Sequence, residues 1–226
     1  MNYASIREAW GLAESQFAEN DYLGSTAADH FSIAERSPML LLTAVHGVRH
    51  KRGHVVKMED QGTGGLVLAL GEACGWSTAV VLREEKYDDA NKNAQHPLKL
   101  DLATRVVPQP PGALVDVHGM KRRGDLDISI GLGREANRSR EVGECLASAF
   151  ADHSLIVDLG AHSTKLRGRS RGSVTAWAQT RGWSAVQLEI APRLRKRSAT
   201  DADRECLLRA FVQGLDAVSS LMTERD

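Results

Sequence analysis

Short apolar runs alternate with amphipathic stretches along most of this chain. Six runs rich in valine, leucine and isoleucine have the length and composition of buried strands. They are Met39–Val45, Thr78–Leu82, Ala113–His118, Asp127–Leu132, Leu155–Leu159 and Ala185–Ile190. Strands that alternate with helices are typical of α/β proteins. The pattern therefore predicts an α/β fold, with a mainly parallel or mixed central sheet and helices on both of its faces.

Three helices are indicated by apolar residues at helical spacing. Gly65–Ala73 follows Thr63, a candidate N-cap, and Ser139–Phe150 places its apolar residues on one face. A longer apolar stripe, between residues 207 and 222, predicts the last helix. The stretch His46–Gly62 is dense in histidine, arginine and lysine and is interpreted as a long loop.

Composition narrows the class of protein. The 226 residues are 42% hydrophobic and 26% charged, as in globular domains, and we expect residues 1–226 to form one domain. The 29 basic and 29 acidic residues give a formal net charge of zero, so no overall electrostatic field attracts the chain to nucleic acid or to a membrane surface. Cys74, Cys145 and Cys206 are widely spaced, which indicates a reducing compartment. Acidic residues interrupt Met1–Phe17, so it does not resemble a signal peptide, and we expect a cytoplasmic protein.

A histidine followed by glycine ends two of the predicted strands, at His46 and at His118. Ligands of open α/β sheets bind beyond the carboxyl ends of the strands, so these two imidazoles can converge on one metal ion. A catalytic zinc ion needs a third protein ligand and an open position for water. We favour Asp60, which lies beside the turn that begins the next helix, and we keep Glu59 and His50 as alternatives. One such histidine alone would more often be a structural strand-end residue; the repetition favours a metal.

Glu189 lies inside the apolar run of the last predicted strand. A carboxylate in such a strand is costly unless it is paired, protonated or bound to something. It is either a structural carboxylate, facing outward from an edge strand or paired with Arg193 or Arg195, or a general base whose pKa is raised by burial. Its spacing does not decide between the two.

Polar and basic loops offer anion-binding groups. Asn91 and Lys92 follow the second predicted strand, and Arg171 lies in the Arg- and Gly-rich run 167–172. These are either solvated surface or a clasp for a substrate carboxylate. No aromatic residues are interleaved for base stacking, which disfavours nucleic acid. Gly131–Arg134 lacks the glycine spacing and the ending of a P-loop, which disfavours a phosphate-binding enzyme.

Five short segments that carry these candidate residues follow one another in an order that resembles the N-formylglutamate amidohydrolase family. The same order resembles the related phage-type poly-γ-glutamate hydrolases of the zinc-carboxypeptidase-like group. The matching segments are Thr43–Gly47, Asp60–Thr63, Asp89–Lys92, Val115–Gly119 and Val186–Ile190. The resemblance implies a phosphorylase/hydrolase-like fold and one zinc ion held by His46, an acidic residue and His118. It also implies that Glu189 is the catalytic base and that Asn91, with a basic neighbour, binds the substrate carboxylate.

The chain departs from the family pattern at two positions. Arg49 stands three residues after the first histidine, where the zinc carboxypeptidases and poly-γ-glutamate hydrolases have their acidic ligand, and Lys92 replaces the usual arginine. We expect a zinc-dependent amidohydrolase that cleaves an amide of an N-acyl amino acid or a glutamyl-type carboxylate, with Asn91, Lys92 and Arg171 orienting this small acidic substrate. The alternative is a non-catalytic anion-binding protein with an incomplete metal site on the same scaffold.

Overall fold

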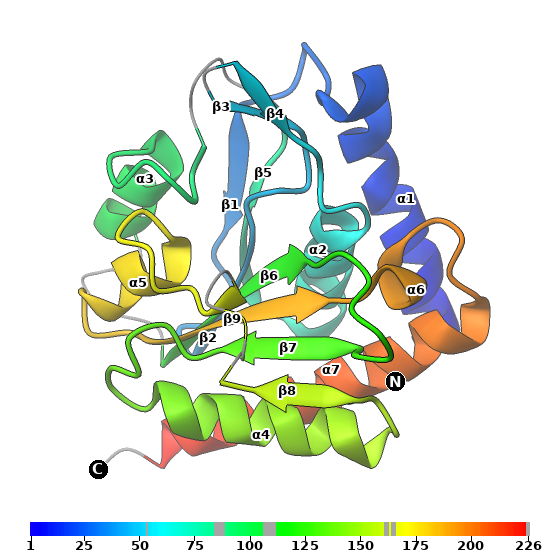
Figure 1. Cartoon of the computed structure of the whole chain (residues 1–226), viewed down its shortest axis with the longest axis vertical. Helices are drawn as coiled ribbons and strands as arrows, with labels where there is room; N and C mark the ends of the chain where they lie inside the picture. Colours follow the sequence, from blue (N-terminus) through cyan, green and yellow to red (C-terminus); the bar gives the residue numbers. More distant parts are fainter. Residues whose placement is uncertain (53, 84–88, 106–111, 161–162, 164–165, 225–226) are drawn as a thin grey trace.

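A seven-stranded sheet forms the centre of the molecule in the computed structural model, which describes residues 1–52, 54–83, 89–105, 112–160, 163 and 166–224 (Figure 1). In spatial order the strands are β1 (Phe31–Ala34), β5 (Ser77–Val81), β2 (Leu40–Ala44), β6 (Ala113–Gly119), β9 (Ser184–Ile190), β7 (Ile128–Gly131) and β8 (Val157–Leu159). Strands β5, β2, β6 and β9 run parallel to one another, whereas β1 and β7 are antiparallel to their neighbours β5 and β9. The predicted mainly parallel or mixed sheet is confirmed.

All six strands expected from the apolar runs are present, with ends that differ by at most two residues. Strands β2, β5 and β9 are buried at every position, which explains their unbroken apolar character. Strand β1 was not predicted, because its four half-buried residues are too few for a periodic signal. The segment interpreted as a long loop contains a short hairpin, β3 (His50–Arg52) and β4 (Val55–Lys57). Its exposed face carries valines, so no apolar-polar alternation marked it.

The helices lie on the sheet in the arrangement expected of an α/β fold. They are α1 (Tyr3–Tyr22), α2 (Thr63–Cys74), α3 (Pro97–Arg105), α4 (Ser139–Asp152), α5 (Val174–Gln179), α6 (Pro192–Arg195) and α7 (Asp201–Thr223). Helices α2, α4 and α7 pack on the strands, and α1 packs against α2 and α7. Helix α5 packs on β6 and β9 from the side to which Asp116 points, since Thr175 of α5 donates a hydrogen bond to that carboxylate.

The start of helix α2 differs from the expectation. Thr63 is the first helical residue and not the N-cap; the cap is Gly62, in the left-handed region with a φ of +85° and no side-chain cap of its own. Glu14 of α1 accepts hydrogen bonds from the backbone N–H groups of Gly62 and Gly65 instead, at 2.7 and 3.0 Å. Trp10 donates to the carbonyl of Gly62 at 2.8 Å. Helix α1 therefore holds the turn that precedes α2.

Helix α1 was missed because few of its side chains are buried. Only Ile6, Trp10 and Phe17 of its twenty residues are buried, which is too sparse for an amphipathic stripe. None of the helices in the described ranges combines the length and the apolar character needed to cross a bilayer.

Candidate metal centre

The carboxyl ends of three adjacent strands, β2, β6 and β9, meet at one edge of the sheet (Figure 1). His46 follows β2 by two residues, His118 lies near the end of β6, and Glu189 lies opposite His118 in β9. Asp60 reaches the same place from the turn before α2, where its backbone N–H donates to the carbonyl of His46 at 2.7 Å. The sheet topology thus brings together residues that are up to 143 positions apart in the sequence.

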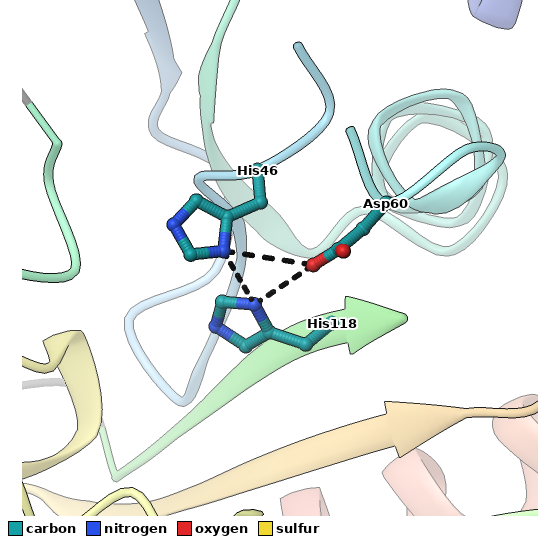
Figure 2. A group of neighbouring side chains, drawn as sticks. All are labelled: His46, Asp60 and His118. Atoms are coloured by element: carbon teal, nitrogen blue, oxygen red, sulfur yellow. Dashed lines mark hydrogen bonds and ion pairs between the residues drawn. The ribbon is translucent and has the colours of Figure 1, made fainter. Parts of the chain in front are cut away.

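His46, Asp60 and His118 converge with one ligand atom each, and these atoms lie within 4.8 Å of one another (Figure 2). The two Nδ1 atoms are 3.1 Å apart, and Oδ2 of Asp60 lies 3.2 Å from Nδ1 of His118 and 3.6 Å from Nδ1 of His46. Ligand atoms that bind tetrahedral zinc at about 2.0–2.1 Å are roughly 3.3 Å from each other. The three side chains therefore fit a single zinc ion without rearrangement.

Each imidazole is oriented by a second carboxylate. Nε2 of His46 lies 2.9 Å from Oδ1 of Asp89, and Nε2 of His118 lies 3.0 Å from Oδ2 of Asp116. Thr43 in turn donates to Oδ1 of Asp116 at 2.7 Å. An Nε2–H group that donates to a carboxylate leaves the lone pair of Nδ1 for a metal, as is usual for metal-binding histidines. Both Nδ1 atoms face the same point.

The electrostatics of the cluster favour a cation at its centre. Burial raises the pKa of Asp60, but hydrogen bonds from His118 and His46 outweigh burial and hold this pKa well below its usual range. Burial lowers the pKa of His118, yet the charge of Asp116 prevails and raises it far above the ordinary value. Three buried carboxylates, those of Asp60, Asp89 and Asp116, thus surround two imidazoles. A divalent ion would replace the proton that otherwise offsets this negative charge.

Of the three residues considered as the third ligand, only Asp60 joins the cluster. Glu59 accepts a hydrogen bond from Nε of Arg49 at 2.9 Å, so these two residues pair with each other. Nε2 of His50 donates a hydrogen bond to the carbonyl oxygen of Val45 at 2.8 Å. Arg49 therefore binds Glu59, and Asp60 is the carboxylate that faces the two histidines. Arg49 is the residue at the position where the resembled proteins have their acidic ligand.

Glu189 is only 7% exposed and lies on the wall of the cavity above the cluster. Burial raises its pKa to about 6, although the charge of His118 lowers it. Gln187 donates to its Oε1 at 2.8 Å. Neither structural alternative is found among the residues that the structure describes. Strand β9 lies between β6 and β7 and is buried at every position, so it is not an edge strand. Glu189 forms no ion pair with Arg193 or Arg195, and Arg193 binds two aspartates instead.

A cavity of about 870 Å³ opens over these residues. Asn91 and Lys92 both line it, and Asn91 is fixed in place because its Oδ1 accepts from the backbone N–H of Val174 at 2.9 Å. Arg171 is exposed and is not among the lining residues. Arg169 of the same basic run does line the cavity.

Several residues of this centre were not anticipated from the sequence. Asp116 lies two positions before His118 on the same strand, so a period-two pattern places both on one face and could have revealed it. Asp89 begins the segment Asp89–Lys92 that matches the family, but nothing in the sequence indicates that it contacts His46. Arg52 of the β3–β4 hairpin binds Asp89 at 2.5 Å, and nothing in its sequence surroundings marked it.

Comparisons with known proteins bear on the fold. No protein-family model matches the sequence, and no curated protein matches it. Among solved structures, a bacteriophage poly-γ-glutamate hydrolase superposes with a TM-score of 0.53 at 14% identity, over 87% of this chain and 93% of that one. The N-formylglutamate amidohydrolase of Ralstonia eutropha gives 0.55 at 13%, over 88% and 100%. A zinc-free apo form of YndL gives 0.51 at 12%, over 84% and 92%. The chain therefore shares the α/β fold of these three structures, as its resemblance implied, at identities that establish the fold alone.

Proposed function

We propose that this chain is a zinc-dependent amidohydrolase in which His46, Asp60 and His118 hold one zinc ion. The observation that supports it most is the convergence of these three ligand atoms, with each histidine oriented by an aspartate, at the carboxyl edge of this fold. The same fold is found in structures described as a poly-γ-glutamate hydrolase and an N-formylglutamate amidohydrolase.

Glu189 is the general base of the proposed reaction. Zinc would supply Lewis-acid chemistry here, lowering the pKa of water toward about 7 and polarising the scissile carbonyl. The carboxylate of Glu189 would accept a proton from the attacking water and pass it to the leaving amine. A pKa of about 6 suits both steps near neutral pH, because the group is ionised at the start and still basic enough to take the proton.

The charge of the cavity wall supports an acidic substrate. Its acidic residues are Glu59, Asp60 and Glu189, two of which belong to the proposed machinery. Its basic residues are Arg52, Lys57, Lys92, Lys121, Arg123, Arg169 and Lys196, besides Arg195, whose guanidinium binds backbone carbonyls. Such a surface attracts carboxylates and orients them next to the site. We assign the binding of the substrate carboxylate to Asn91 and Lys92, and keep Arg171 as a further contact that needs the basic loop to close over the cavity.

The alternative, an anion-binding protein without catalysis, assumed that the metal site lacks its acidic ligand because Arg49 occupies that position. Asp60 beside both histidines removes this reason. Metal content separates the two functions. The purified chain should bind about one zinc ion per molecule, and a chelator should abolish hydrolysis of N-acyl glutamates or short γ-glutamyl peptides until zinc is returned. A chain that binds no zinc after chelation and reloading would exclude the enzyme.

The choice of third ligand can be tested with a matched pair of variants. Asp60→Asn should weaken zinc affinity by ten- to a hundredfold or more, since a neutral amide replaces a buried anionic ligand. Glu59→Gln should change it little, because Glu59 pairs with Arg49 and not with the histidines. Zinc affinity is measured by competition with a chelating dye. The opposite ranking would move the ligand by one residue.

A further inference from the structure

Arg195, the last residue of α6, is a buried cation that binds backbone carbonyls. Its side chain is 4% exposed, and the guanidinium donates from Nε to the carbonyl of Ile190 at 3.0 Å, from Nη1 to Gln61 at 2.6 Å and from Nη2 to Met120 at 3.1 Å. It forms no ion pair within the described ranges. Each of the three guanidinium nitrogens thus donates to a backbone carbonyl of a different segment.

These carbonyls have a common position relative to the candidate site. One belongs to the residue after Asp60, one to the residue after Glu189, and one to the second residue after His118. The guanidinium therefore connects the turn before α2 with the ends of β9 and β6. These are the three segments that present an acidic ligand, the proposed base and a histidine ligand to the cavity.

Two glycines leave room for this arginine. A Cβ atom at Gly119 would lie 2.2 Å from Cζ of Arg195, and one at Gly62 would lie 2.2 Å from its backbone carbonyl oxygen. Gly119 is the glycine of the second His-Gly pair, and Gly62 caps α2 next to the Asp60 turn. Any side chain at either position would displace the arginine or the segment that it holds.

A buried guanidinium is costly, and its geometry is specific. Removing a charged group from water is unfavourable unless hydrogen bonds replace its hydration, and the three carbonyls supply those bonds. The planar fork of arginine directs its N–H groups along fixed directions, whereas a lysine ammonium is a point charge on a flexible stem. Only arginine can therefore connect the three segments at set distances.

We propose that Arg195 is the positioning residue of this site: it sets Asp60, His118 and Glu189 relative to one another without touching the metal or the substrate. The inference rests on the proposed function, because the geometry it maintains is that of the zinc ligands and the base. Hydrogen-bonded groups behind metal ligands typically account for ten- to a hundredfold in metal affinity.

The test measures the affinity of zinc alone for the full chain, by chelator competition, in the wild type and in Arg195→Lys, Arg195→Ala and Arg193→Ala. Arg193 lies on the same short helix but is 51% exposed and pairs with Asp127 and Asp203, so its variant is the matched control. We expect both Arg195 variants to lose ten- to a hundredfold in zinc affinity and the control to stay at the wild-type value. The melting temperature of each zinc-free variant is measured in parallel.

The Lys variant decides the case, since it keeps the charge and most of the stem and should fold. Wild-type zinc affinity in Arg195→Lys would overturn the proposal while leaving the metal site intact. A second outcome would also overturn the proposal. If both Arg195 variants lose zinc binding only because the zinc-free protein no longer folds, Arg195 is a structural residue. A wild-type chain that binds no zinc would instead refute the proposed function on which this inference stands.

Discussion

Glu189→Gln should lower the turnover of any amide substrate by about a hundredfold to ten-thousandfold, the usual effect of losing a general base. Glutamine preserves the shape of the side chain and its contact with Gln187, but it does not accept a proton. Zinc affinity should stay near the wild-type value, because Glu189 is not one of the three candidate ligands. The measurements are the rate under saturating zinc and the zinc affinity by chelator competition.

The pH dependence follows from the raised pKa of Glu189. Burial lifts it from 4.5 to about 6, so the proton is bound more tightly in the folded chain than in the unfolded chain. The stability that this proton confers is present below pH 4.5 and is lost as the pH rises through about 6. Glu189→Gln should therefore raise, and not lower, the melting temperature of the zinc-free protein at pH 8. The rate of the wild type should rise with pH through a midpoint at or below about 6, since a nearby zinc ion favours the carboxylate.

A different result would identify Glu189 as structural. In that case the melting temperature at pH 8 falls in the variant, while the rate per folded molecule is unchanged. Gln187→Leu is a useful companion, because it removes the hydrogen bond to Glu189 and leaves the carboxylate in place. It should shift the midpoint of the rate profile upward, since the bond from Gln187 supports the ionised form.

His46→Ala and His118→Ala should each abolish stoichiometric zinc binding, because a site of three protein ligands retains only two. Each variant should keep the fold, as the cluster lies at the edge of the sheet and outside the apolar core. Zinc content by elemental analysis and far-ultraviolet circular dichroism make the two measurements. His54→Ala is the control, because His54 is an exposed histidine between β3 and β4, outside the cluster. Full zinc content in both cluster variants would disprove the assignment.

The sequence by itself indicated six of the seven strands of the sheet and two of the three candidate ligands. Runs such as Ala113–His118 are apolar throughout because parallel strands are covered on both faces, so each run could be recognised without its neighbours. The His-Gly pairs then located His46 and His118, because the carboxyl ends of parallel strands lie at one edge of a sheet. These conclusions depend on local patterns joined to one general rule of topology.

The sequence favoured Asp60 but left Glu59 open, and the tertiary structure showed which of the two faces the histidines. The two residues are adjacent and chemically alike, so their chemistry alone does not separate them. In the structure Glu59 pairs with Arg49, and Asp60 faces the histidines. The role proposed for Arg195 also depends on three carbonyls, two of which lie 75 and 134 positions away in the chain. Backbone carbonyls are present at every residue, so no sequence pattern shows which of them a side chain will meet. A contact of that kind is defined by the packing of distant segments, which the order of residues encodes only through the complete fold.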